Sequence, residues 1–398
     1  EVVDAVTFAR DHRHLPLGIR SAGHGISGRS TNDGGLVIDV SALNEIEVLD
    51  ADRRLVRVGP GVTWKQVAAA LAPHGWAITS GDHGGVGVGG LATAGGIGML
   101  GRQQGLTIDH VRAVELVLAD GSTVRASEHA NPDLFWAVRG AGASFGIATS
   151  FELEAEEVDQ VGWAQLTFAT TDLEAALVAY GRIQAQAPRD TTMFLVTGTP
   201  QGGQAVLQLY GVVASPDPDT IIERLNPFVE IGQLVQQQVV LAPYHAVMGM
   251  APDTGPDGHH GAGEPVSRSG FLTSLTPEFA HDAATALRAG RIRWFQLRAM
   301  GGAVADVAPE AMAFSHRSPE LQVTVMGTFH AVLDEAWEPL ERHMEGLYLS
   351  FDTGPGPDRL ERAVPADVLA RLRDLKHRYD PDALFRDNFP LVHQGEPV

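Results

Sequence analysis

Glycine is concentrated in three stretches of the amino-terminal part of the chain, and this distribution constrains the fold more than any other feature. It is dense over 18–35, over 81–105 and at Gly140, Gly142 and Gly146, whereas the intervening stretches have the patterns of ordinary strands and helices. The total of 45 glycines in 398 residues exceeds the usual share of about 7%. Because glycine permits positive φ angles and close, side-chain-free approach, we expect these stretches to bring backbone against one large ligand.

The composition is that of a globular chain long enough for one or two cores, with 44% hydrophobic and 20% charged residues. The 29 basic and 49 acidic residues give a net charge of −20 with no basic patch, which argues against nucleic acid and anionic lipid as partners. The longest mostly apolar runs, such as Val114–Ala119, are far shorter than the about 20 residues that span a bilayer, so we expect no membrane insertion. The absence of cysteine excludes disulfides and thiolate chemistry, and from it we expect a cytoplasmic location.

The order of strand and helix patterns in the sequence changes at about Glu152. Before it, strand patterns at 36–40, 55–58 and 111–119 are mixed with helix patterns at 2–13, 64–71 and 131–140. After it, strand patterns (162–168, 193–197, 204–213, 295–300 and 321–329) alternate with amphipathic helix patterns (172–187, 219–228 and 277–289). We predict an α+β protein with a first domain over 1–152, a second domain over 153–350 and a carboxyl-terminal return to the first domain over 351–398. The second domain is expected to be an antiparallel sheet covered on one side by helices.

Gly85-x-Gly87-x-x-Gly90 matches the dinucleotide fingerprint of a βαβ unit. We reject that interpretation because the helix it requires would be interrupted by glycines that each cost about 1 kcal/mol relative to alanine. These glycines are Gly95, Gly96 and Gly98. The motif instead predicts a long, nearly side-chain-free loop whose peptide N–H groups converge on phosphate oxygens.

His24 lies in the first glycine stretch, within the segment from Arg20 to Arg29. On its own it would be interpreted as a polar turn residue, as would most of the 16 histidines. Its glycine surroundings favour a second interpretation, in which a nucleophilic imidazole nitrogen meets the ring of a bound cofactor.

Four motifs occur in the order typical of one family. They are Arg20-Ser-x-Gly-His24 with Gly28 and 32–35, Val86–Gly90 with Gly95-Gly96, Phe135–Gly142 with Phe145-Gly-Ile147, and Tyr379–Arg386 with Asn388. Together they resemble the berberine bridge enzyme-like oxidoreductases, which belong to the vanillyl-alcohol oxidase, or PCMH-type, flavoproteins. The resemblance runs from Ile19 to Leu391. It implies a PCMH-type FAD-binding domain of two subdomains joined to a substrate domain.

The resemblance also implies the cofactor and the residues that hold it. His24 corresponds to the family histidine that bonds covalently to the flavin 8α-methyl group. His83 stands where many relatives carry a cysteine as second tether, so a single histidyl link to FAD is expected. The residues implied for FAD binding are His24, Arg20, Ser21, Ala22, Gly23, Gly25, Ser27, Gly28, Gly81, Gly85, Val86, Gly89, Gly90, Leu91, Gly95, Gly96, Gly146, Ile147 and Asn388.

Four side chains are candidates for catalysis. Gln296 and Arg298 stand where relatives often carry an acid, and alternate residues of a strand share one face, so they are expected to bind an anionic or carbonyl group of the substrate. The alternative is that this face meets solvent or a helix. Tyr348 is a candidate acid or base, and His83 either lines the oxygen-facing side of the flavin or has a structural role.

The resemblance implies an oxidase that transfers hydride from a small, partly apolar organic substrate, such as a secondary metabolite, to the flavin, with O₂ as acceptor. Two alternatives remain open, namely a monooxygenase that holds oxygen on flavin N5 and oxygenates polyketide-like substrates, and a flavin-binding protein without turnover. We expect no metal site, although His259, His260 and Glu264 lie close together in one Pro- and Gly-rich segment. The sequence leaves the oligomeric state open between monomer and homodimer.

Overall fold

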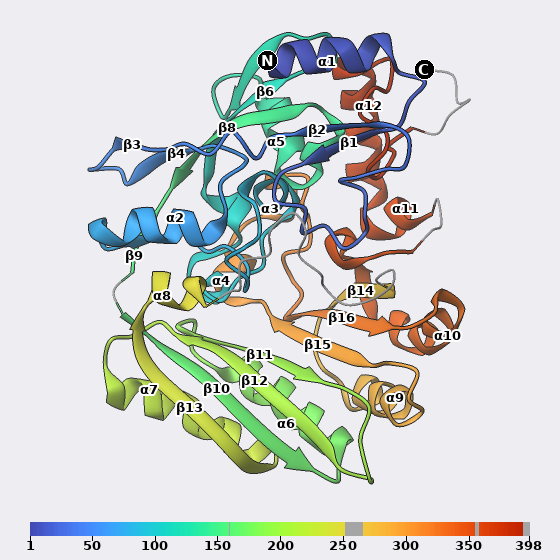
Figure 1. The fold of residues 1–398 in the computed structure, drawn as a ribbon. Helices are drawn as coiled ribbons and strands as arrows, with labels where there is room; N and C mark the ends of the chain where they lie inside the picture. The colour runs from blue at the N-terminus through green and yellow to red at the C-terminus, as the bar shows by residue number, and fades with distance from the viewer. Residues whose placement is uncertain (159, 251–265, 355–357, 393–398) are drawn as a thin grey trace.

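Two β-sheets organise the protein, one in the upper and one in the lower part of Figure 1. The computed structural model describes residues 1–158, 160–250, 266–354 and 358–392. We call the part built on the five-stranded sheet the first lobe and the part built on the eight-stranded sheet the second lobe. Mixed helices and antiparallel sheets confirm the predicted α+β class.

The first lobe has strand order β3-β4-β8-β6-β7, and all four strand pairings are antiparallel. This topology agrees with the rejection of a βαβ unit. A parallel pair, β1-β2, and a short pair, β5-β9, accompany the sheet. The strands are β1 (Leu17–Arg20), β2 (Leu36–Asp39), β3 (Ile46–Asp50), β4 (Leu55–Val58), β5 (Trp76–Ala77), β6 (Val111–Val117), β7 (Thr123–Ser127), β8 (Ile147–Glu154) and β9 (Glu156–Glu157). The helices are α1 (Val2–Asp11), α2 (Trp64–Leu71), α3 (Val88–Ala94), α4 (Gly101–Gln104) and α5 (Pro132–Ala141).

Local sequence signals account for several of these elements. Thr63 begins α2 with a capping box, in which the Gln66 side chain accepts a hydrogen bond from the Thr63 backbone N–H at 2.8 Å. The chain leaves the helical conformation near the end of α5, where Gly140 has a φ of 135°.

The second glycine stretch differs from its prediction as an open loop, because Val88–Ala94 form the helix α3. Two apolar side chains favour this helix, since Val88 and Ala92 are 0% and 1% exposed. It ends after seven residues at Gly95, whose φ of 137° is open to glycine. The glycines therefore limit the length of the helix rather than prevent it.

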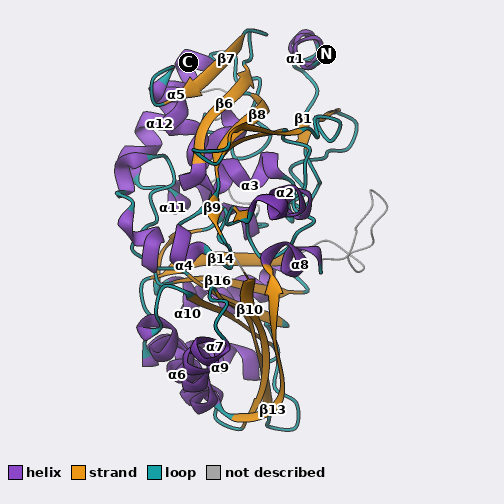
Figure 2. Ribbon diagram, turned by 90° about the vertical axis from the view of Figure 1, so that its left-hand side faces the viewer, coloured by secondary structure: helices purple, strands orange, loops and turns teal. Residues whose placement is uncertain are grey.

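The second lobe has strand order β13-β10-β12-β11-β15-β16-β14-β17, with antiparallel pairing throughout. Its main helices lie on one face of the sheet (Figure 2), as the sequence predicts. The strands are β10 (Gln160–Thr170), β11 (Thr191–Thr197), β12 (Ala205–Val213), β13 (Gln233–Pro243), β14 (Val266–Leu272), β15 (Trp294–Ala299), β16 (Leu321–Gly327) and β17 (Met344–Leu347). The helices are α6 (Leu173–Gln186), α7 (Pro218–Leu225), α9 (Pro277–Arg288) and α10 (His330–Glu341), and a short helix α8 (Tyr244–Gly249) follows β13.

The chain then returns to the first lobe through α11 (Arg359–Ala363) and α12 (Ala366–Tyr379). Helix α12 contacts α5 and stands beside the first lobe in Figure 1. The domain limits 1–152, 153–350 and 351–398 stay a prediction.

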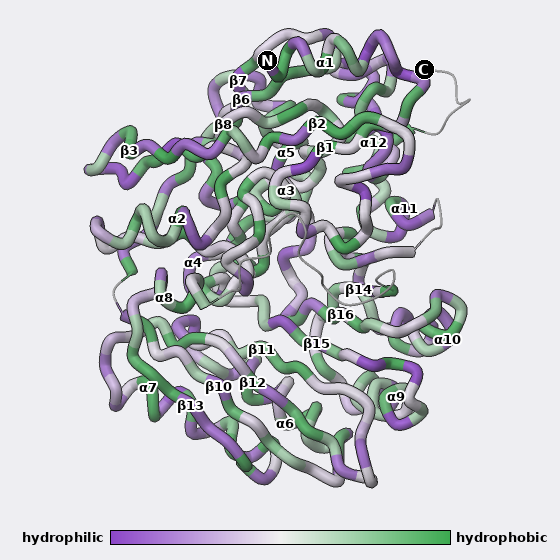
Figure 3. The backbone as a smooth tube through the Cα atoms, in the orientation of Figure 1, coloured by the Kyte–Doolittle hydropathy of each residue, from purple (hydrophilic) through white to green (hydrophobic). Residues whose placement is uncertain are grey.

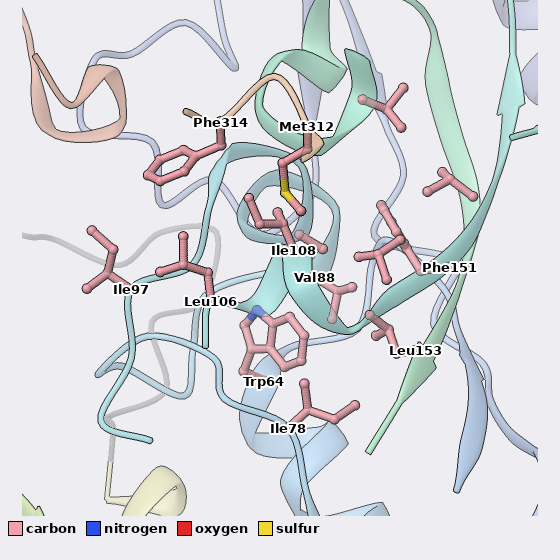
Figure 4. Close-up of a cluster of buried hydrophobic side chains, with 14 of the residues drawn as sticks. Trp64, Ile78, Val88, Ile97, Leu106, Ile108, Phe151, Leu153, Met312 and Phe314 are labelled. Atoms are coloured by element: carbon pink, nitrogen blue, oxygen red, sulfur yellow. The ribbon is translucent and has the colours of Figure 1, made fainter. Parts of the chain in front are cut away.

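Each lobe has its own hydrophobic core, and the tube in Figure 3 is coloured hydrophobic along much of both. Figure 4 shows part of the first core, where Trp64 of α2 lies near Val88 of α3. Met312 and Phe314, from the segment that precedes β16, complete this core. The first core therefore includes residues that lie far along the chain, between strands of the second sheet.

Candidate active site

The first two glycine stretches pack directly on each other. The hydroxyl of Ser21 donates a hydrogen bond of 2.6 Å to the carbonyl oxygen of Pro60. A Cβ atom added to Gly87 would lie 2.1 Å from the Ser21 oxygen and 2.9 Å from the backbone nitrogen of Ala22. Glycine is therefore required at position 87 for the two segments to approach this closely.

Two histidines meet where these stretches come together. The ring centroids of His24 and His83 lie 5.1 Å apart. The backbone N–H of Gly85 donates a hydrogen bond of 3.1 Å to Nδ1 of His83. A Cβ atom on Gly85 would lie 3.2 Å from Nε2 of His24, so both imidazoles lie against bare backbone.

The residues predicted to hold FAD have features that fit such a cofactor. Open space lies beside Gly25, Gly28 and Gly90, since a Cβ atom built at any of them meets no atom within 4 Å. A backbone without side chains, together with a nearby imidazole, fits a flavin that needs N–H donors for its pyrophosphate and a nucleophile for its ring. Positive φ angles, which side chains disfavour, occur at Gly23, Gly28, Gly81, Gly95 and Gly96.

The other predicted cofactor residues lie in three places. Leu91 fills the space between Gly81 and Gly96, because a Cβ atom on either glycine would come within 3.2 Å of its side chain. The carbonyl oxygen of Asn388 accepts a hydrogen bond of 2.5 Å from Arg29, which brings the carboxyl-terminal segment to the first glycine stretch. Gly146 and Ile147, by contrast, pack against Val117 of β6 rather than against either histidine.

A polar cluster joins the two lobes beside His83. The hydroxyl of Tyr210, on β12, donates a hydrogen bond of 2.6 Å to Oδ2 of Asp82. Nε2 of Gln296, on β15, donates a hydrogen bond of 2.5 Å to the oxygen of Tyr210. Nη2 of Arg298 lies 3.2 Å from the same carboxylate oxygen of Asp82. We call these four residues the interlobe cluster.

The face that carries Gln296 and Arg298 is buried, with 1% and 6% of each residue exposed. The alternative that this face meets solvent or a helix is wrong, since both side chains point to residues of other strands and of the first lobe. Arg298 also donates to the side-chain oxygen of Gln322 at 3.2 Å and lies 4.3 Å from the ring centre of Phe351.

Charge is distributed unevenly within the cluster. Burial tends to raise the pKa of Asp82, but the positive charge of Arg298 and the hydrogen bonds from Tyr210 and Arg298 hold it below its ordinary value. Burial and the negative charge of Asp82 raise the pKa of Tyr210 well above its ordinary value. At neutral pH the cluster therefore contains an ionised Asp82 and a neutral Tyr210 beside the guanidinium group of Arg298.

Tyr348 lies at the second glycine stretch, within a set of aromatic rings. A Cβ atom on Gly95 would be 3.5 Å from its hydroxyl oxygen. Its ring centre lies 5.3 Å from that of Phe271 and 5.5 Å from that of Phe351. Burial raises the pKa of Tyr348, so its hydroxyl keeps its proton at neutral pH.

The sequence analysis did not identify Asp82 or Tyr210. A signal for Asp82 exists, because it is the one charged residue between Gly81 and Gly90. Tyr210 has no comparable signal, since an aromatic residue on a strand is usual. Their meeting depends on how the lobes pack, which a single sequence pattern does not encode.

Two further predictions concern metals and membranes. Among the described residues, no group of three or more histidine or acidic side chains is placed to hold a metal ion. His259, His260 and Glu264 lie outside the described residues. None of the helices that the structure describes combines the length and hydropathy of a membrane-spanning helix.

Comparison with known proteins identifies an FAD binding domain and FAD-linked relatives. The FAD binding domain family matches residues 1–127. (R)-6-hydroxynicotine oxidase of Paenarthrobacter nicotinovorans is 27% identical over 423 residues, covering 99% of this chain and 89% of the relative. An FAD-dependent monooxygenase of Cochliobolus heterostrophus is 34% identical over 211 residues, covering 52% of this chain and 40% of the relative. A variant of BBE-like 1 from Physcomitrella patens has a similar fold, with a TM-score of 0.85 at 21% identity over 99% of this chain and 90% of that one.

The fold and these matches define an FAD-linked oxidoreductase. Within that class, the chain shares its fold with the berberine bridge enzyme-like protein of Physcomitrella patens, and its motifs resemble those of that family.

Proposed function

We propose that this oxidoreductase is an oxidase that removes hydride from a small organic molecule at a flavin bound covalently to His24, with O₂ as the second substrate. The observation that carries the proposal is the placement of the interlobe cluster directly beside His83, which contacts His24. Bound FAD would supply the hydride acceptor at this point. The side chains of the chain itself would bind and orient the substrate.

The cluster favours a substrate that donates a hydrogen bond. The single hydroxyl proton of Tyr210 is given to Asp82, so the Tyr210 oxygen must accept from the Nε2 group of Gln296. This fixes the orientation of the Gln296 amide. Its other atom, Oε1, is then a buried acceptor without a partner among the described residues. A buried acceptor of this kind selects a hydroxyl or amine hydrogen, because leaving it unpaired costs about 1–3 kcal/mol. We therefore propose an alcohol or amine substrate, in line with a secondary metabolite.

We propose His83 and Tyr348 as the hydrogen-bond donors of the substrate site. Since Nδ1 of His83 accepts from the Gly85 N–H, the neutral imidazole carries its proton on Nε2. Tyr348 keeps its hydroxyl proton because burial raises its pKa. Arg298 and Asp82 hold the strand β15 against the glycine stretch, and this orients Gln296.

The covalent link is tested by acid denaturation and intact-mass measurement. We expect the yellow colour and the mass of FAD to stay with the wild-type polypeptide and to separate from His24→Ala. His83→Ala is the matched control, because it alters the neighbouring imidazole and should leave the link intact. Colour released from the wild type on unfolding would reject the link.

The donor requirement is tested with Gln296→Met, which keeps the length of the side chain and removes the acceptor. With an alcohol or amine that bleaches the flavin anaerobically, we expect the variant to raise KM about 5- to 100-fold, as the loss of one buried hydrogen bond implies. An unchanged KM would reject the role of Gln296. Formation of H₂O₂ during turnover checks O₂ as acceptor.

A second candidate function is monooxygenation, which the similarity to the Cochliobolus enzyme favours for part of the chain. The two functions differ in the fate of oxygen. Turnover under ¹⁸O₂ with mass spectrometry of the product separates them, since an oxidase leaves no label in the product and a monooxygenase inserts one atom.

A further inference from the structure

The outer strand of the eight-stranded sheet has features that are unusual for an edge. Strand β13 pairs with β10 on one side and ends the strand order on the other. Figures 1 and 2 show it at the outer margin of the second lobe. It is 11 residues long and contains no charged side chain between Gln233 and Pro243. Edge strands of monomers usually carry charges that prevent pairing with another chain.

Apolar side chains are exposed on both faces of this strand. Val239 and Leu241, which pair with Ala164 and Gly162, are 42% and 43% exposed. Val240 lies on the opposite face and is 40% exposed. Figure 3 shows hydrophobic colour on β13. Burial of such side chains would stabilise contact with another chain.

Both ends of the strand are protected, whereas none of the described residues protects its middle. The pairing with β10 shifts register at Val235, which is the position of a bulge. Pro243 ends the strand and has no backbone N–H to donate. The unprotected stretch is therefore Gln236–Ala242.

The net charge of the protein and the neutral sequence of this stretch together favour a second copy of the chain as its partner. At a net charge of −20, two copies repel each other, and this repulsion is weakest where they meet at a neutral surface. Antiparallel pairing about Val239 places Gln236 opposite Ala242 and Gln238 opposite Val240, so each pair is uncharged and Val239 meets its own copy. The stretch is thus compatible with itself across a two-fold axis.

We propose that β13 is the interface of a two-fold symmetric dimer, in which the two strands pair antiparallel between Gln236 and Ala242. Each eight-stranded sheet then continues into that of the second copy. Because the like charges of the two copies are screened by salt, the dimer strengthens as ionic strength rises. The proposal is independent of the proposed reaction.

The test is sedimentation of the full-length holoprotein over a dilution series, at about 50 mM and about 500 mM salt. We expect a dimer that dissociates on dilution. In low salt, where the dimer is weaker, dissociation should begin at a higher protein concentration than in high salt. Val239→Lys and Gln237→Lys place a charge on the exposed edge, and both are expected to be monomeric with an unchanged circular dichroism spectrum. Gln237→Lys removes no apolar contact, which keeps the test valid if Val239→Lys is unstable.

Val206→Lys is the matched control. Val206 is 52% exposed on β12, an inner strand of the same sheet that pairs on both sides, so the variant is expected to dimerise like the wild type. A wild type that sediments as a monomer at every concentration, or a Gln237→Lys variant that remains a dimer, overturns the proposal.

Discussion

A buried ion pair fastens the carboxyl-terminal segment to the first lobe, and its removal gives the sharpest test of how that lobe is stabilised. Nζ of Lys376 donates hydrogen bonds to Oδ2 of Asp380 at 2.6 Å, to the carbonyl oxygen of Ser144 at 2.6 Å and to that of Phe385 at 2.8 Å. The two charged side chains are 1% and 0% exposed. The Asp380 carboxylate also accepts from the backbone N–H groups of Leu384 and Phe385, at 2.8 and 2.9 Å.

We predict that Lys376→Met lowers the free energy of unfolding by about 3–5 kcal/mol, because it leaves the Asp380 carboxylate buried without a counter-ion. Urea denaturation followed by circular dichroism and by flavin fluorescence measures this loss. The double variant Lys376→Met/Asp380→Asn removes both charges, so it should recover a large part of the stability. Arg182→Met is the surface control, because its pair with Glu230 is exposed and should contribute at most about 1 kcal/mol. A loss below about 1 kcal/mol for Lys376→Met would show that the reasoning is wrong.

Two further predictions concern the glycine stretches and pH. Gly87→Ala should lower the FAD content of the purified protein, read from the ratio of flavin to protein absorbance, because the added Cβ atom would lie 2.1 Å from the Ser21 oxygen. Gly75→Ala is the control. Gly75 has a φ of 71°, which disfavours alanine, but the added Cβ atom would meet no atom within 4 Å, so FAD content should be unchanged. Burial lowers the pKa of His316, so the unfolded chain binds a proton at higher pH than the folded one, and stability should fall as pH drops below about 6.5. His316→Phe should reduce the loss of unfolding free energy between about pH 7.5 and pH 5.5, and an identical loss in both proteins would refute this assignment.

The sequence predicts much of the fold because its local signals agree with the final packing. The helix that begins after Thr63 and the strands β10, β11, β12, β15 and β16 of the second lobe follow from capping and periodicity. Strand β13 was missed because its run of glutamines has no alternation of polar and apolar residues. The helix α3 was missed because the low helix propensity of its glycines argues against a helix. Burial of Val88 and Ala92, which stabilises this helix, is visible only in the folded structure.

The candidate site shows where local reasoning ends. Gln296 and Arg298 were placed on one face correctly, because strand geometry alone decides this. Their contact with Asp82 depends on the packing of two lobes, and a sequence pattern carries no information on that distance. The residues proposed to hold FAD rest on the family motifs and stay a proposal.

The position of α12 and the segment after it has a consequence for biosynthesis. The strands of the first lobe's sheet are synthesised early. The Lys376–Asp380 ion pair and the contact of Asn388 with Arg29 form only after the second lobe has been made. The amino-terminal lobe is thus incomplete throughout most of translation. Capture of the flavin should accordingly follow release of the nascent chain rather than accompany its synthesis.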